Sequence, residues 1–309
     1  MITRNRMITC CTHQNDMRDD TLYHYCSVSA FASIIKNNLI WLSSLSLSND
    51  YMEGKLTRDA FDRLLKQSDI NACNDIANVQ RIIHTTEKMF DGLGFCLSQK
   101  PDLLSQWRGY ADDGQGFSIG FSKSYIKTLS EKRSQKNPHF KLFDAIYEPS
   151  EHEEALKPAF NSIKTFIDSG GLKEPQPFMP NDEKMRTVKF LSQNWEFFIN
   201  IAFEILPKIY CLKSKAFEEE HECRLISNLM RNFEFSNQNL ELATATYRVA
   251  RNRLIPFREV HLVKLGTMKP IKEVHIGPKN ITPVHEVERF LYQCGHKDVE
   301  VKLSSATYR

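Results

Sequence analysis

The chain has 309 residues, of which 41% are hydrophobic and 26% are charged, a composition typical of a globular protein with a sizeable core. The formal net charge of +3 is too small to indicate a nucleic-acid-binding protein by itself. The richest apolar stretch, residues 197–206, contains Asn200 and Glu204 and is too short to span a bilayer. We therefore expect a protein that does not interact with a membrane.

The eight cysteines are scattered along the chain, and no two of them have the C-x-x-C spacing of zinc ligands. Neither a metal site nor a disulfide framework is expected, so the thiols are predicted to be reduced. Residues 1–20 are polar and of mixed charge, which excludes a signal peptide within them. These features together indicate a cytoplasmic protein.

Regular structure is expected to begin after a flexible leader of residues 1–21. Residues 22–26 form a short aromatic run that is typical of a strand. Ser27 or Ser29 can cap the helix that follows, and Asn37-Asn38 is a suitable left-handed stop.

The rest of the chain interleaves short strands with helices. Strands are expected at 39–42, 94–98, 116–121, 143–147, within 217–226, and at 260–263, 274–276 and 299–303. Helical patterns cover about 55–90, 150–210 (with one helix at 182–206) and 283–292. Because no regular βαβ alternation is visible, we predict an α+β fold, with residues 22–309 as one domain and 150–210 as a helical insertion.

Glu220-x-Glu222-x-Arg224 is the most informative local pattern. On a strand, residues two apart point to the same face, so both carboxylates and the guanidinium would share one surface. One interpretation is a solvent-facing ladder of ion pairs, which the preceding Glu218-Glu219 favours. The other is one side of a ligand-binding cleft, since Cys223, Leu225 and Ile226 could face a core.

Aromatic and histidine residues supply the other candidates. His24 stands between two tyrosines, where a histidine is either packed in a core or part of a site. Trp107 and Tyr110 could form a stacking wall for a ring or the edge of a core, since both residue types are common in either setting. The sequence leaves these alternatives open.

Short motifs in a fixed order give the chain a resemblance to a family. They are Leu22-Tyr23-His24-Tyr25, Trp41-Leu42-Ser43, Asn49-Asp50 with Glu53-Gly54, Phe95–Ser98, Trp107–Ala111, Gly116–Phe121, Lys213-Ser214, Glu220–Arg224, Ile276-Gly277-Pro278 and Tyr308-Arg309. Over about residues 22–309 the chain resembles domain-of-unknown-function family 2971. Cys26 and Phe217 depart from the threonine and tryptophan that are common in that family.

A deeper resemblance is to ADP-ribosyltransferases, in which an early strand supplies a histidine and a late strand a catalytic glutamate. It implies a mixed, split β-sheet core with flanking helices. It also implies that NAD is the cofactor and is consumed as a substrate. The implied catalytic residues are Glu222, Glu220 and His24. Glu222 would stabilise the cationic ribose, Glu220 would orient or deprotonate the acceptor, and His24 would bind a ribose.

The same resemblance implies a set of NAD-binding residues. They are His24, Tyr25, Ser43, Asn49, Trp107, Tyr110 and Arg224. Tyr25 or Tyr110 would stack on the nicotinamide, and Arg224 would keep Glu222 ionised.

Three functions follow as hypotheses. The first is an NAD-dependent ADP-ribosyltransferase, a toxin or phage-defence effector that modifies a protein or nucleic acid, with an antitoxin or defence partner. The second is a non-catalytic ligand-binding or interaction module on the same fold. The third is another activity, such as NAD hydrolysis or nucleic-acid processing. Which of Glu220 and Glu222 would be the essential carboxylate stays open.

Overall fold

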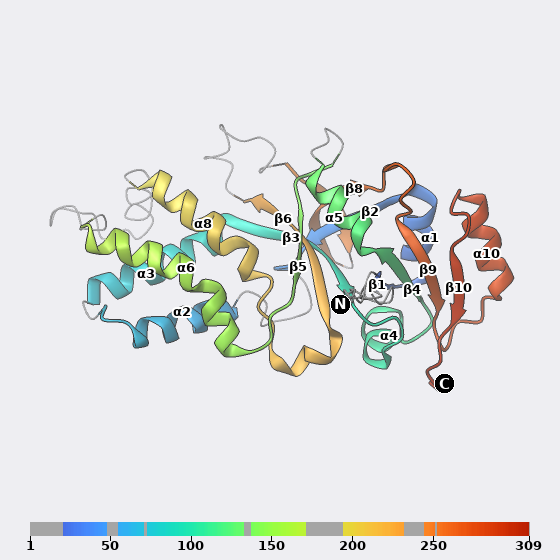
Figure 1. Cartoon of the computed structure of the whole chain (residues 1–309), viewed down its shortest axis with the longest axis horizontal. Helices are drawn as coiled ribbons and strands as arrows, with labels where there is room; N and C mark the ends of the chain where they lie inside the picture. The colour runs from blue at the N-terminus through green and yellow to red at the C-terminus, as the bar shows by residue number, and fades with distance from the viewer. Residues whose placement is uncertain are drawn as a thin grey trace, which may run out of the picture.

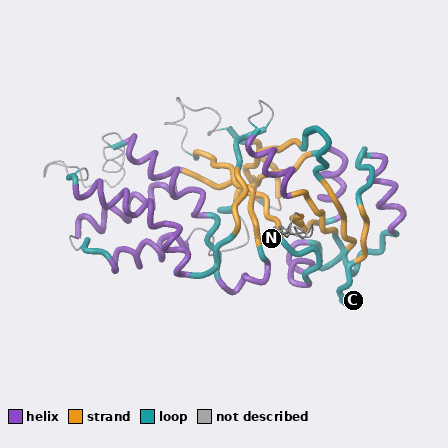
Figure 2. The backbone as a smooth tube through the Cα atoms, in the orientation of Figure 1, coloured by secondary structure: helices purple, strands orange, loops and turns teal. Residues whose placement is uncertain are grey.

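The computed structural model describes residues 21–47, 55–70, 73–132, 137–170, 194–231, 244–250 and 252–308. These residues form an elongated α+β molecule, with a helical layer at one end and a mixed sheet through the middle and the other end (Figures 1 and 2). The predicted α+β class is confirmed. The expected leader lies outside the described residues, except for Thr21, which is already the first residue of a strand.

The described strands form one ten-stranded sheet in the order β10-β9-β4-β1-β3-β2-β8-β7, with β6 paired to β3 and β5 paired to β6. The strands are β1 (Thr21–Cys26), β2 (Leu39–Ser44), β3 (Phe90–Ser98), β4 (Phe117–Ser122), β5 (Lys141–Asp144), β6 (Glu222–Met230), β7 (Thr246–Ala250), β8 (Arg253–His261), β9 (Ile271–Ile276) and β10 (Glu300–Leu303). Strands β9 and β10 are parallel, whereas the other pairs are antiparallel.

Strand β3 is the point at which the sheet divides. One edge of β3 pairs with β6 along its whole length, from Phe90 to Ser98. The other edge is shared, because β1 pairs with Ser98 and β2 pairs with Gly94 and Leu93. The two halves of the sheet therefore separate on one side of β3 and are joined by β6 on the other.

Helices cover the sheet on both faces. They are α1 (Val28–Asn37), α2 (Lys55–Gln67), α3 (Cys73–Met89), α4 (Leu104–Tyr110), α5 (Lys123–Glu131), α6 (Pro149–Asp168), α8 (Trp195–Ile209), α10 (Val284–Gln293) and the 3₁₀ helix η2 (Lys215–Glu220). Helices α2, α3, α6 and α8 gather at one end of the molecule (Figure 1). The expected insertion is therefore helical where it is described, and it shares its layer with the two helices of residues 55–89.

Local chemistry explains the first helix. The Ser27 side chain accepts a hydrogen bond from the backbone N–H of Ala30 at 3.2 Å, which confirms one of the two predicted caps. Asn38 ends the helix in the left-handed conformation, with φ of 52°, a geometry that asparagine tolerates better than most residues. The chain then turns directly into β2.

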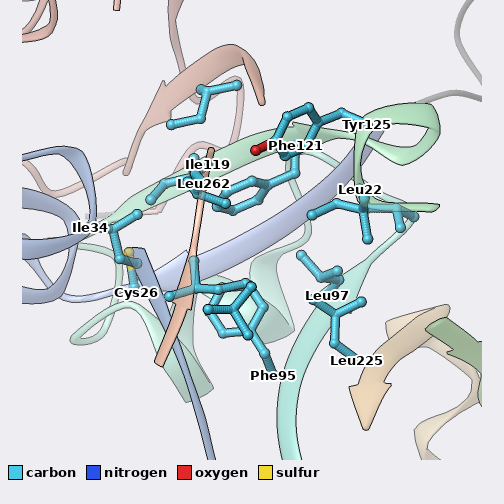
Figure 3. Packing of buried hydrophobic residues seen from close by; sticks show 14 of the residues in the cluster. Leu22, Cys26, Ile34, Phe95, Leu97, Ile119, Phe121, Tyr125, Leu225 and Leu262 are labelled. Carbon is cyan, nitrogen blue, oxygen red and sulfur yellow. The ribbon is translucent and has the colours of Figure 1, made fainter. Parts of the chain in front are cut away.

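Two hydrophobic cores lie on the two faces of β3 and β6. One contains Phe95, Leu97 and Leu225 together with α1, and we call this side the α1 face. Figure 3 shows Phe95, Leu97 and Leu225 within that packing. The other core contains Ile226 together with α8, and we call this side the α8 face. Because β6 is buried on both faces, neighbouring residues of this strand belong to different cores.

The structure differs from the sequence-based expectations at three places. The strand expected within residues 217–226 begins only at Glu222, because η2 ends at Glu220, so Glu220 does not lie on that strand. The segment with Trp107 and Tyr110 is the short helix α4. Strand β7 was not predicted. The Asn49-Asp50 motif and the first half of the helix expected at 182–206 lie outside the described residues.

Candidate functional site

The predicted pair Glu222 and Arg224 opens strand β6 on the α8 face. The two residues are only 7% and 4% exposed, so the interpretation as a solvent-facing ladder is wrong. Arg224 Nε donates to Glu222 Oε1 at 2.7 Å, and Nη2 donates to Oε2 at 2.9 Å. This two-point geometry is the strongest form of carboxylate–guanidinium pairing. Arg224 Nη1 also donates to the carbonyl of Tyr210, just after α8, which ties the pair to the helical layer.

Lys213 completes the cluster, and sequence reasoning did not assign it a role in the site. Its ammonium group donates to Glu222 Oε2 at 2.5 Å and also to Glu220 Oε2. Lys213 is itself only 5% exposed, although lysine is rarely buried unless it is paired. Two buried carboxylates therefore share two buried cations. We call Lys213, Glu220, Glu222 and Arg224 the ionic cluster.

Glu220 reaches this cluster from a different element than expected. It is the last residue of η2, and His221 follows in the left-handed conformation with φ of 43°. This turn takes Glu220 off the strand, so it does not share a strand face with Glu222. Its backbone carbonyl is fixed by the Ser98 hydroxyl, which donates to it at 2.7 Å. Glu220 is nevertheless buried, at 7% exposed.

Both members of the Glu222–Lys213 pair are held in their charged forms. Burial alone would raise the pKa of Glu222, but Arg224 and Lys213 override it and lower the pKa to about 2. Burial alone would lower the pKa of Lys213, whereas the charge of Glu222 and the hydrogen bonds to both glutamates raise it above its ordinary value. The ionic cluster is thus internally compensated at neutral pH.

Three aromatic residues border the ionic cluster. The Tyr110 hydroxyl lies 3.4 Å from Glu220 Oε1, and Tyr110 is 52% exposed. Burial of the hydroxyl, and then the charge of Glu220, raise the pKa of Tyr110. The Tyr147 hydroxyl accepts from the backbone N–H of Glu222 at 2.8 Å. Lys213 Nζ lies 5.0 Å from the centroid of the Phe217 ring, and Phe217 is 37% exposed.

His24 lies at the division of the sheet rather than in the ionic cluster. Its Nδ1 donates to the carbonyl oxygen of Cys96 at 2.9 Å, and its ring stacks on Phe95 with centroids 4.0 Å apart. Burial lowers the pKa of His24 to about 4, only partly opposed by the bond to Cys96, so the ring is neutral at neutral pH. These are the contacts of a packed, hydrogen-bonded histidine of intermediate exposure.

The strand registers place His24 and Glu222 on opposite faces of the sheet. Tyr23 pairs with Ser98, and Ser98 pairs with Glu222, so these three side chains share one face. His24 is the next residue after Tyr23 and therefore points to the other face, where it meets Phe95. The structure does not bring the expected histidine to the expected glutamates.

The remaining predicted residues fall at different distances from the ionic cluster. Ser43 pairs with Gly94, which pairs with Ile226, so Ser43 shares the α8 face but is level with a residue that lies roughly 13 Å along β6 from Glu222, and it is two strands away from β6. Tyr25 is buried, and its hydroxyl donates to the carbonyl of Lys100 at 2.8 Å. Asn49 lies outside the described residues.

Trp107 belongs to a small core. It is 0% exposed and packs edge-on against Tyr25, with ring centroids 4.9 Å apart. Its indole N–H donates to Asp102 Oδ1 at 2.6 Å. The rings and the indole N–H of Trp107 are therefore both in contact with the rest of the protein, and they attach α4 to it. Tyr110 is the exposed aromatic residue of that helix.

A row of paired residues, which we call the polar row, connects the ionic cluster to β9, the strand next to the edge strand β10. Glu222, Ser98, Tyr23, Gly120 and Glu273 are consecutive partners across β6, β3, β1, β4 and β9. Beyond Gly120 the Tyr23 hydroxyl donates to Glu273 Oε1 at 2.6 Å. Sequence reasoning did not find this row, because its members come from five strands with no common motif.

Comparison with known proteins gives a match to one family model. Residues 106–225 match the model of a family described as a protein of unknown function (DUF2971). The match begins within α4 and ends within β6, so it contains Tyr110 and all four residues of the ionic cluster but not His24. No curated protein and no solved structure matches the chain significantly. The expected likeness to ADP-ribosyltransferases therefore has no support from these comparisons.

Two further findings concern metals and membranes. Among the described residues, no three His, Cys, Asp or Glu side chains are grouped so that they could hold a metal ion. In the same part of the chain, no helix combines the length and apolar character needed to cross a membrane. The groups present at the ionic cluster are two carboxylates, an ammonium, a guanidinium and the phenol of Tyr110.

Proposed function

We propose that the chain is a non-catalytic module that binds a ligand or partner at the ionic cluster, rather than an active NAD-dependent ADP-ribosyltransferase. The observation that carries this proposal is the state of Glu222, whose two carboxylate oxygens are both occupied by donors from Arg224 and Lys213. A carboxylate that stabilises a ribosyl cation must present its charge to the substrate. Glu222 presents its charge to the protein instead.

The position of His24 supports the same proposal. The transferase hypothesis needs the histidine and a catalytic glutamate beside one NAD molecule. His24 points to the α1 face and is hydrogen-bonded to Cys96, whereas Glu222 points to the α8 face. A fold can keep its strands after the chemistry is lost, which is consistent with this arrangement.

An ADP-ribosyltransferase in which Glu220 replaces Glu222 is the second candidate. It is favoured by one observation, namely that Glu220 Oε1 has only the 3.4 Å contact with Tyr110. NAD would then be the substrate, with a protein or nucleic acid as acceptor and an antitoxin or defence protein as partner. The cytoplasm is the proposed location for either function, because Cys26, Cys96, Cys211, Cys223 and Cys294 are free thiols that suit a reducing compartment.

Nicotinamide release separates the two candidates. The full chain is incubated with NAD labelled in the nicotinamide and, separately, in the adenine, with and without a cell lysate. A binding module releases no more nicotinamide than the Glu220→Gln variant and transfers no label to protein or nucleic acid. Release that Glu220→Gln abolishes and Glu219→Gln preserves would overturn the proposal, since Glu219 is the exposed neighbour in η2.

A further inference from the structure

The hydrogen-bond inventory of the ionic cluster separates its two glutamates. Glu222 accepts two bonds from Arg224 and one from Lys213, so both of its oxygens are occupied. Glu220 accepts from Lys213 on Oε2, but the one contact of Oε1 within the described residues is the Tyr110 hydroxyl at 3.4 Å. That distance is long for an O–H···O bond, whose usual range is about 2.5–3.0 Å. Glu220 is therefore a buried carboxylate with an under-used acceptor oxygen.

The under-used oxygen lies beside a residue that is itself partly exposed. Tyr110, whose hydroxyl contacts it, is 52% exposed, and Phe217, whose ring lies near Lys213 Nζ, is 37% exposed. Buried acceptors are nearly always satisfied by protein, water or a ligand. An acceptor at the border between buried cations and exposed rings is suited to a donor that arrives from solution.

Local charge indicates which donor fits. Residues 213–224 carry four glutamates against Lys213, Lys215 and Arg224. Lys213 and Arg224 are committed to the two buried glutamates, and Lys215 pairs with Glu148. Glu218 and Glu219 are exposed on η2. An arriving anion would meet this negative surface, whereas a cation would be attracted to it.

The aromatic rings indicate which kind of cation the site would bind. Ring faces attract cations, and planar cations stack on them more effectively than an ammonium does. A planar N–H donor can stack on a ring while donating in its own plane to a carboxylate. We propose that Glu220, and not Glu222, is the ligand-accepting carboxylate, and that it takes a planar cation with N–H donors, of the amidinium or guanidinium class, against Tyr110 and Phe217.

This inference rests on the proposed binding function, and three probes of one shape test it. Benzamidine is a planar cation, benzamide is its neutral analogue and benzoate is its anionic analogue. Titration calorimetry on the full chain should give benzamidine a Kd at least about tenfold lower than that of benzamide, with benzoate weakest. Benzoate binding as tightly as benzamidine, or no benzamidine binding up to its solubility limit, would overturn the inference.

Variants locate the binding. Glu220→Gln should raise the Kd of benzamidine about tenfold or more and remove the preference over benzamide, while Glu288→Gln, at an exposed position of α10 away from the site, leaves both unchanged. If Glu220→Gln does not fold, Tyr110→Ala supplies the test, because this half-exposed ring can be removed without opening a core. Tyr110→Ala should weaken benzamidine several-fold, and unchanged binding in that variant would refute the site. Nicotinamide release by the wild-type chain would contradict the proposed binding function whatever the probes do. Absence of benzamidine binding would contradict only the ligand assigned here, so the two outcomes can be told apart.

Discussion

His24 and Glu222 lie on strands that are separated only by β3, yet their side chains leave the sheet on opposite faces. The separation follows from the pairing of Tyr23 with Ser98, since one residue of register decides the face of every side chain in a strand. It packs the His24 ring against Phe95, which gives a testable dependence of stability on pH.

The free energy of unfolding should fall as the pH is lowered from about 6.5 to about 4 because of His24. The folded pKa, about 4, lies below the ordinary value of 6.5, so the unfolded chain binds the proton first. The contribution is complete above pH 6.5, is lost as the pH falls toward 4, and amounts to at most about 3 kcal/mol.

Urea unfolding at pH 7 and pH 4.5 measures this effect. His296, whose pKa burial also lowers, adds to the same window, so wild type is compared with His24→Gln. The variant should lose part of the pH dependence, whereas His285→Gln, at an exposed position, should keep all of it. Identical pH dependence in wild type and His24→Gln would mean that His24 titrates normally.

Replacing Glu222 by glutamine should destabilise the protein rather than act silently. The variant leaves Lys213 and Arg224 buried without a shared counter-charge, a situation that typically costs about 3–5 kcal/mol. Chemical denaturation measures the loss, with Glu219→Gln expected to lie within about 0.5 kcal/mol of wild type. An unchanged denaturation midpoint in Glu222→Gln would show that the cluster is solvated.

Gly120→Ala should disrupt the polar row between Tyr23 and Glu273. An added Cβ would lie 2.9 Å from Glu273 Cγ and 3.1 Å from Tyr23 Cε1, closer than carbon atoms normally approach. We expect a loss of roughly 1–3 kcal/mol. Gly109→Ala is the matched control, because nothing lies within 4 Å of its Cβ and helix α4 should gain about 0.5–1 kcal/mol. Thermal unfolding of the two variants should therefore shift in opposite directions.

Asp102 should control the mobility of α4. Its carboxylate accepts from the Trp107 indole and the Ser304 hydroxyl at 2.6 Å, and from the N–H and hydroxyl of Ser305 at 2.7 Å. Asp102→Ala removes every one of these bonds and should cost about 1–3 kcal/mol. Amide exchange at residues 104–110 should accelerate.

Asp113→Ala provides the comparison for that experiment. Asp113 accepts from Tyr308 and Lys279 at the surface, where such bonds contribute little. Exchange in α4 should stay close to wild type in this variant. If Asp102→Ala and Asp113→Ala change amide exchange in α4 equally, the hydrogen bonds from Asp102 to residues 304–305 do not stabilise the helix.

Sequence reasoning succeeded where the signal is local. The helix cap and the left-handed stop depend on neighbours within a few residues. Ser27 was one of the two predicted caps, and Asn38 belongs to the predicted Asn37-Asn38 stop. The shared face of Glu222 and Arg224 follows from strand periodicity alone. These features need no knowledge of the tertiary fold.

The rest of the candidate site depends on tertiary contacts that no local pattern encodes. Lys213 enters through the chain reversal between α8 and η2, and its two partners identify it only when the segments are folded together. Glu220 was misplaced because a residue in the left-handed conformation, His221, interrupts a segment that looks like one strand. The face of His24 depends on the register of β1 against β3, which the sequence does not state.

The pairing of β3 with β6 also sets the order in which the protein can assemble. Ser98 fixes the backbone of Glu220 across a separation of 122 residues, so the ionic cluster forms only after a long loop has closed. Such contacts make folding slow, and chains that have not completed it cannot display the cluster. A ligand of the cluster would bind folded chains but not unfolded or partly folded ones, and would stabilise the folded chains by mass action. Occupancy of the cluster would then report the quality of the fold as well as the concentration of the ligand.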